Sequence, residues 1–207
     1  MLKDWSNVII PEEEEINERL EKARNKLVQQ QILIMQKKLP VLVSFDGWGA
    51  AGKGSILGKI IKNIDPRFFK VAVMDKPTED EKRRPFLYRY VINIPEAGKF
   101  TFMDGGCLDE VTKQKLSGKI TDEEYKRKIE SVKRFERQLS DNGYLVIKFF
   151  FHIGEQEQRK RLTRLLDDKN TRWRVSEYDL WQNQHYKKSL KAFDQFIDDT
   201  SQSIAPW

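Results

Sequence analysis

A glycine-rich stretch around residue 50 carries the residue types of a phosphate-binding loop. The pattern Gly47-x-x-x-x-Gly52-Lys53 follows an apolar run over residues 41–45 and leads into a helix-like segment. In a strand–loop–helix unit, the loop N–H groups and the helix N-terminus face an anion, and the lysine adds a mobile positive charge. A glycine-rich turn that only packs tightly is the structural alternative. The residues expected to bind phosphate are Gly47, Gly49, Ala50, Ala51, Gly52, Lys53, Gly54 and Ser55.

Two positions of this loop lack the usual groups for holding magnesium. Gly54 stands where a Ser or Thr hydroxyl would bind the ion, and Gly49 leaves the loop without a carboxylate. A strand predicted over residues 99–103 places Asp104 at its carboxyl end, where ligands lie in open parallel sheets. We therefore expect Asp104 to hold the metal and to act in catalysis with Lys53. The alternative is that Asp104 only caps the next helix.

A basic stretch over residues 155–174 predicts a lid above this loop. It holds seven Lys or Arg residues against four Asp or Glu residues. Arginine guanidinium groups bind phosphate oxygens in pairs, so a mobile basic helix would neutralise a phosphoryl group or follow a longer phosphate chain. A solvated helix face is the alternative. The lid residues expected to bind phosphate are Arg159, Arg161, Arg164, Arg172 and Arg174.

Composition favours one globular domain outside the membrane. The 207 residues are 39% hydrophobic and 34% charged, and the longest apolar stretch, over residues 144–153, is too short to span a bilayer. Residues 1–10 lack the basic start and apolar block of an export signal, and the single Cys107 cannot form an internal disulfide. We therefore expect a cytoplasmic protein. The net charge of +6 permits a polyanionic partner.

The order of the predicted elements indicates an α/β fold, with a parallel sheet and helices on both faces. Strands are predicted over residues 41–45, 68–74, 99–103 and 145–152, with helical segments between them. We expect an amphipathic helix over 1–39 and a phosphate-binding domain over 40–207 that includes a lid over about 155–175. Three capping-box patterns predict helix starts. They are Thr78-x-x-Glu81, Thr121-x-x-Glu124 and Ser176-x-x-Asp179.

Taken together, these segments resemble the polyphosphate kinase 2 family over nearly the whole chain. The resemblance implies a P-loop kinase-like three-layer fold, with phosphoryl transfer between polyphosphate and a nucleotide, AMP or ADP, and Mg²⁺ as cofactor. The motifs that carry it are Phe45-Asp46-Gly47-Trp48, Gly52-Lys53-Gly54, Asp65-Pro66-Arg67, Lys76-Pro77-Thr78-Glu79, Phe135-Glu136, Ile147-Lys148-Phe149, His152-Ile153, Trp173 with Asp179, and Ala205-Pro206-Trp207.

The chain departs from the family pattern at residues that carry chemistry. In the family, one aspartate inside the loop and another after the third strand hold magnesium, and Gly49 replaces the first. The family's Asp-Arg-Ser-Trp-Tyr run keeps Asp104 but has Gly105 for the arginine, and Leu165 stands where the family has a lid arginine. Such losses look like the degenerate first copy of tandem members that use AMP. Because the family continues beyond Trp207 with a strand and a helix, the resemblance also implies a C-terminal truncation.

Several functions stay open at this point. We favour a catalytically degenerate domain that binds phosphates or a partner copy and contributes structure. The alternatives are an active polyphosphate-dependent nucleotide kinase and an ATP-dependent small-molecule kinase. Nucleic-acid binding is disfavoured, because only Trp173 offers a stacking ring among the basic residues. The expected partners are polyphosphate, AMP or ADP, and a second copy of the domain or a homo-oligomer.

Overall fold

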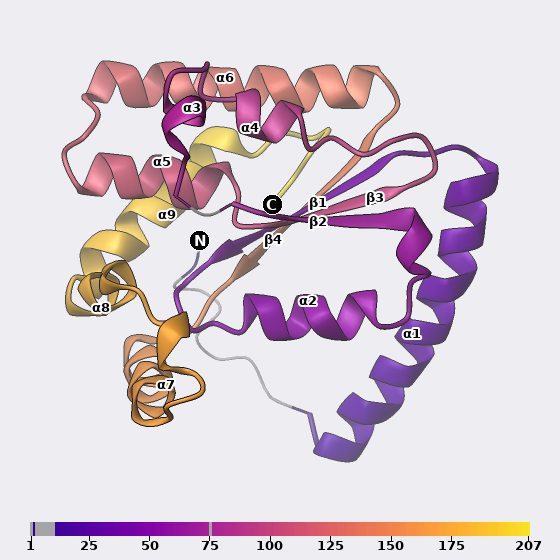
Figure 1. The fold of residues 1–207 in the computed structure, drawn as a ribbon, viewed down its shortest axis with the longest axis horizontal. Coiled ribbons are helices and arrows are strands. Elements are labelled where there is room, and N and C mark those ends of the chain that lie inside the picture. The colour runs from indigo at the N-terminus through magenta and orange to yellow at the C-terminus, as the bar shows by residue number, and fades with distance from the viewer. Residues whose placement is uncertain (1, 3–10, 75) are drawn as a thin grey trace.

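The computed structural model describes residues 2, 11–74 and 76–207 and has a parallel sheet with helices on both faces (Figure 1). The four strands lie in the order β2-β3-β1-β4, and each neighbouring pair is parallel. This arrangement confirms the predicted α/β architecture. The strand bounds are Val41–Gly47 for β1, Phe69–Val73 for β2, Phe100–Asp104 for β3 and Leu145–Phe151 for β4.

The central strand β1 separates two apolar cores by its alternating side chains. Val41, Val43 and Phe45 pack on one face with α2 (Lys53–Ile61) and the second half of α1 (Glu13–Gln36). Leu42 points to the opposite face (Figure 1). The helices on that face are α4 (Tyr88–Val91), α5 (Cys107–Leu116), α6 (Asp122–Asp141) and α9 (Tyr186–Thr200). The sheet therefore forms the middle of three layers. The loops that follow the strands lie at the carboxyl ends of the strands.

The remaining helices largely follow the predicted starts. All three capping boxes are present, each with a reciprocal pair of hydrogen bonds. The final predicted helix is broken at His185, whose backbone is not helical. The bounds are Glu79–Lys82 for α3, Tyr88–Val91 for α4, Cys107–Leu116 for α5, Asp122–Asp141 for α6, Glu155–Asp167 for α7, Glu177–Gln184 for α8 and Tyr186–Thr200 for α9, with short 3-10 helices at Pro66–Phe68 and Arg172–Arg174.

Of the helix expected over residues 1–39, the structure describes Glu13–Gln36 as α1. Most of residues 1–10, on which the expected lack of an export signal depends, lie outside the described residues. Leu27 and Ile34 of α1 pack against the β1 core, whereas Val28 and Ile32 are largely exposed. None of the described helices is both long enough and apolar enough to cross a membrane.

A buried ion pair fixes the end of the described chain to the sheet. Lys148 of β4 donates to both carboxylate oxygens of Glu136 on α6, at 3.0 and 2.9 Å. The Lys148 ammonium also lies 4.7 Å from the ring centroid of Trp207, whose Nε1 donates to Thr200 Oγ1. Burial lowers the pKa of Lys148 and raises the pKa of Glu136. Removing either partner would leave an unpaired charge in the protein interior, which would strongly destabilise the fold.

This pair generates a stability prediction. Lys148→Met leaves Glu136 buried without its counter-charge, so we expect the free energy of unfolding to fall by about 3–5 kcal/mol. The double variant Lys148→Met with Glu136→Leu buries no charge and should be closer to the wild type. Urea denaturation followed by circular dichroism measures both. A double variant that is no more stable than the single one would contradict this role of the pair.

Candidate phosphate-binding site

A buried tryptophan holds the loop between β1 and α2 in place. The Trp48 ring is fully buried and stacks on Tyr186 of α9 at a centroid distance of 4.1 Å, with Phe193 at its edge. Its Nε1 donates to His152 Nδ1 at 3.0 Å. Gly47, before it, has φ +137°, and a Cβ there would lie 2.4 Å from the Phe151 carbonyl oxygen. The loop therefore leaves β1 in a path that requires glycine and is pinned by an aromatic side chain.

A cavity of about 1100 Å³ opens between this loop and the basic segment. The start of α2 faces it with N–H groups that no side chain caps, so the positive end of the helix dipole points into the cavity. The lining residues are Trp48, Ala50, Ala51, Gly52, Lys53, Gly54, Ser55, Asp104, Glu157, Lys160, Arg161, Leu162, Arg164, Leu165, Asp168, Thr171, Trp173 and Arg174.

The predicted phosphate-binding residues divide into two groups. The six from Ala50 to Ser55 line the cavity, whereas Gly47 and Gly49 do not. The Gly49 N–H instead donates to Gln182 Oε1 at 2.9 Å, and its carbonyl accepts from Gln158 Nε2 at 3.2 Å. Gln158 also donates to Gln182, so these two buried glutamines connect α7, α8 and the loop. The backbone of Gly49 thus holds the lid in place.

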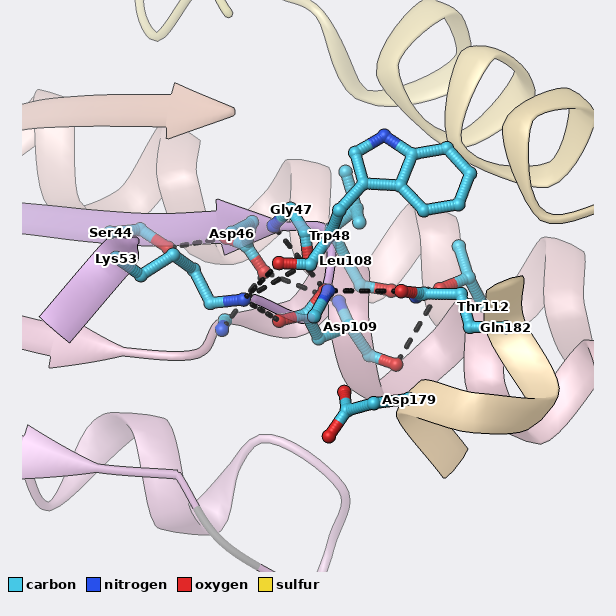
Figure 2. A network of polar contacts seen from close by, with 12 residues as sticks. Ser44, Asp46, Gly47, Trp48, Lys53, Leu108, Asp109, Thr112, Asp179 and Gln182 are labelled. Atoms are coloured by element: carbon cyan, nitrogen blue, oxygen red, sulfur yellow. Dashed lines mark hydrogen bonds and ion pairs between the residues drawn. The ribbon is translucent and has the colours of Figure 1, made fainter. Parts of the chain in front are cut away.

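Lys53 lines the cavity, but its ammonium group is turned toward the loop (Figure 2). Its Nζ donates to the carbonyl oxygens of Gly47 at 3.1 Å and Trp48 at 3.2 Å. It lies 3.9 Å from Asp109 Oδ2 on α5. An anion in the cavity must therefore compete with these oxygens for the lysine.

Two carboxylates, those of Asp46 and Asp109, lie near Lys53 (Figure 2). Neither was predicted as a site residue. Asp46 is buried and accepts hydrogen bonds from Ser44 Oγ at 2.6 Å, Gly106 N at 2.9 Å and Asp109 N at 3.2 Å. Desolvation raises the pKa of Asp46, and these donors oppose the rise. Asp109 keeps 32% of its side chain exposed, yet desolvation, together with the neighbouring Asp46 charge, raises its pKa to about 7 against the opposing pull of Lys53.

Asp104 lies at the edge of the same cavity, as predicted. It ends β3, and a Cβ added to Gly54 would lie 3.9 Å from its Oδ2. Among the residues that the structure describes, no cluster of three or more His, Cys, Asp or Glu side chains could hold a metal ion. A magnesium site made by the protein alone therefore does not fit these residues. An ion that arrives on substrate phosphates fits better, because Mg²⁺ is commonly bound by one or two carboxylates plus phosphate oxygens and water.

The space of a loop carboxylate at position 49 is filled by Asp179. A Cβ on Gly49 would lie 2.1 Å from Asp179 Oδ1 and 2.7 Å from its Cγ. The other carboxylate oxygen of Asp179 is held in the capping box, where it accepts from the N–H and the hydroxyl of Ser176. Glycine at this position is therefore a condition for α8 to pack against the loop.

The five predicted lid arginines do not act as a group. Arg161 points to the loop and donates to the carbonyl oxygens of Ala50 and Ala51, at 3.5 and 3.3 Å. Arg164 and Arg174 line the cavity. The two other predicted lid arginines are not among the cavity-lining residues, and one of them, Arg159, contacts Asn183 and Glu155 instead. Lys160, which the sequence did not single out as a phosphate-binding residue, also lines the cavity.

The charge of Asp109 generates a pH prediction. Because its pKa is about 7, Asp109 is mostly protonated at pH 6 and ionised at pH 8, where it attracts Lys53 and repels anions. Sulfate, which does not titrate in this range, should bind more tightly at pH 6. At pH 8, Asp109→Asn should bind sulfate about three- to tenfold more tightly than the wild type.

Calorimetric titration at both pH values measures this effect. Asp109→Asn keeps both histidines, His152 and His185, so any pH dependence that remains in the variant belongs to other groups. An equal pH response in the wild type and the variant would remove Asp109 from the account.

The contact between Gly49 and Asp179 generates a second prediction. Gly49→Asp alone should lower the free energy of unfolding by about 1–3 kcal/mol through overpacking. Asp179→Gly removes the contacting side chain at the cost of the Ser176 cap and of helix propensity. In a double-mutant cycle, the double variant should be more stable than the sum of the single effects. Strict additivity in chemical denaturation would contradict the steric account.

Comparison with known proteins finds similar polyphosphate phosphotransferases. The chain is 28% identical to ADP-polyphosphate phosphotransferase 3 of Rhizobium meliloti, over 81% of this chain and 59% of the relative. It is 31% identical to the polyphosphate:AMP phosphotransferase of Pseudomonas syringae pv. tomato, over 83% of this chain and 34% of the relative. The chain thus spans less than two thirds of either protein.

The structural comparison confirms the predicted P-loop kinase-like fold. The crystal structure of polyphosphate kinase 2 from Arthrobacter aurescens matches with a TM-score of 0.86 at 26% identity, over 91% of this chain and 68% of that chain. The model of the family described as Polyphosphate kinase 2 (PPK2) matches residues 11–207. Since that match covers all but the first ten residues, this chain belongs to the polyphosphate kinase 2 family.

Proposed function

We propose that this chain binds polyphosphate and a nucleotide, AMP or ADP, in the cavity between the loop and the basic lid. The observation that carries the proposal is the joint lining of one cavity by the uncapped start of α2, Lys53 and the cationic side chains of Lys160, Arg161 and Arg164. The names of two relatives, an ADP-polyphosphate and a polyphosphate:AMP phosphotransferase, support this choice of ligands.

Phosphoryl transfer asks the protein mainly to position the reactants and to neutralise charge. In this proposal, N–H groups of residues 52–55 hold a phosphate, and Lys53 exchanges its contacts with loop carbonyls for phosphate oxygens. Arg161 already contacts the loop, so a small shift of its guanidinium group would place it against the same phosphate.

Magnesium has a restricted place in this proposal. Asp104 would be its protein ligand, with substrate phosphates and water completing the set. When bound, the ion would neutralise negative charge on the phosphate oxygens. Gly49 and Gly54 supply no further side-chain ligand, so the ion should be held loosely.

We further propose that the chain transfers phosphate slowly, as a degenerate member of its family. Position 49 lacks a carboxylate, and its space is filled by Asp179. Position 105 is a glycine with φ +90°, where the family has an arginine. Each absence removes a group that would stabilise transition-state charge, and the loss of one such group typically costs about a hundred- to a thousandfold in rate.

Binding and turnover are tested together with purified protein. The wild type should bind tripolyphosphate in a salt-dependent manner, and Lys53→Ala should weaken that binding at least about tenfold. In a coupled assay with polyphosphate and ADP or AMP, turnover should lie at least about a hundredfold below that of an intact family member.

An Arg159→Ala variant serves as the matched control, because Arg159 carries the same kind of charge outside the cavity lining. Equal tripolyphosphate affinity in the wild type and Lys53→Ala would remove the loop from the site. Turnover at ordinary kinase rates of about 1–100 per second would overturn the proposed degeneracy.

A further inference from the structure

The 3-10 turn Arg172–Arg174 presents an exposed aromatic ring to the same cavity. Trp173 is 76% exposed, the highest value among the exposed large apolar side chains of the described chain, and it lines the cavity with Lys53 and Arg164. Exposing most of an indole ring to water costs free energy that burial would recover. A ring left open beside a cationic cavity therefore points to a ligand with an apolar, flat part.

A hydrogen bond and a cation–π contact restrain the Trp173 ring. Its Nε1 donates to the Asn170 carbonyl oxygen at 2.8 Å, which fixes the orientation of the indole plane. The guanidinium carbon of Arg174 lies 5.3 Å from the ring centroid, within the range of a cation–π contact. These contacts restrain the indole while most of its surface stays open.

The other described tryptophans pack against neighbouring side chains. Trp48 stacks on Tyr186 inside the core, and Trp181 stacks between Tyr178 and His185. Trp207 packs against Phe196 and Lys148. Within the described chain, Trp173 alone combines a largely exposed ring with a position in the loop cavity.

We propose that the open face of Trp173 stacks on the base of the nucleotide whose phosphates bind at the start of α2. This inference rests on the proposed function and names the group that recognises the nucleoside part of the substrate. An inorganic phosphate chain has no flat apolar surface and would gain nothing from the indole ring. A nucleotide places its phosphates among the cations and its base against the ring, so one cavity serves both parts.

Base–aromatic stacking is worth about 1–3 kcal/mol per base, which corresponds to about a 5- to 150-fold change in affinity. We therefore expect Trp173→Ala to bind ADP about 5- to 150-fold more weakly than the wild type. Tripolyphosphate, which lacks a base, should bind both proteins within about twofold. Trp173→Phe should recover most of the ADP affinity, because its ring can still stack.

Intrinsic fluorescence gives a second readout. ADP should quench part of the wild-type tryptophan emission, and tripolyphosphate should not. The ADP-dependent part should be absent in Trp173→Phe and kept in the control Trp181→Phe, because Trp181 does not line the cavity.

The outcomes separate this inference from the proposed function. If the wild type binds tripolyphosphate and Trp173→Ala binds ADP as the wild type does, the stacking role is wrong and the phosphate site stands. Equal weakening of ADP and tripolyphosphate would make Trp173 a structural residue of the lid and would also overturn the inference. If the wild type binds neither ligand, the proposed function fails and the inference fails with it.

Discussion

The end of this molecule at which we propose that phosphate binds depends on one buried carboxylate, Asp46. A buried charge must be matched by donors, and Asp46 receives them from Ser44, from Gly106 and from the N–H of Asp109 in the first turn of α5. These bonds tie the end of β1 to the turn after β3 and to the start of α5. The same bonds place the Asp109 carboxylate 3.9 Å from Lys53 Nζ. The negative charge of Asp109 therefore offsets the positive charge that Lys53 brings to the loop.

The packing and the backbone around the loop explain why positions 49, 105 and 106 are glycines. Gly106 is closely approached by Asp46 and Ser44, since an added Cβ would lie 2.2 Å from a carboxylate oxygen and 2.4 Å from the hydroxyl. Gly49 is approached by Asp179 in the same way, and Gly105 has a left-handed backbone that disfavours other residues. Replacing any one of these glycines therefore requires a neighbouring side chain or the backbone to move.

Local patterns in the sequence predicted the fold well and the site only in part. The strands, the loop and the capping boxes are short-range features, and each follows from residues close in the chain. Gly49 is hydrogen-bonded to Gln158, which is 109 positions away in the chain, and to Gln182, which is 133 positions away. No local sequence pattern reveals contacts over such separations. Helical periodicity could have separated the lid residues that face the cavity from those that do not. Arg161, Leu165 and Asp168 share the cavity-facing side of the lid, away from Arg159. The break at His185 had no sequence signal.

Binding and catalysis make different demands, and the function that we propose for this chain depends mainly on the first. Binding an anion requires N–H groups and positive charge, which the start of α2, Lys160, Arg161 and Arg164 supply. Acceleration of transfer requires groups that interact more strongly with the transition state than with the bound substrate. Positions 49 and 105 are glycines, and their backbones are committed to packing and turning. The proposed slow transfer is therefore compatible with a phosphate cavity, because the contacts that build the cavity are separate from those that would lower the barrier.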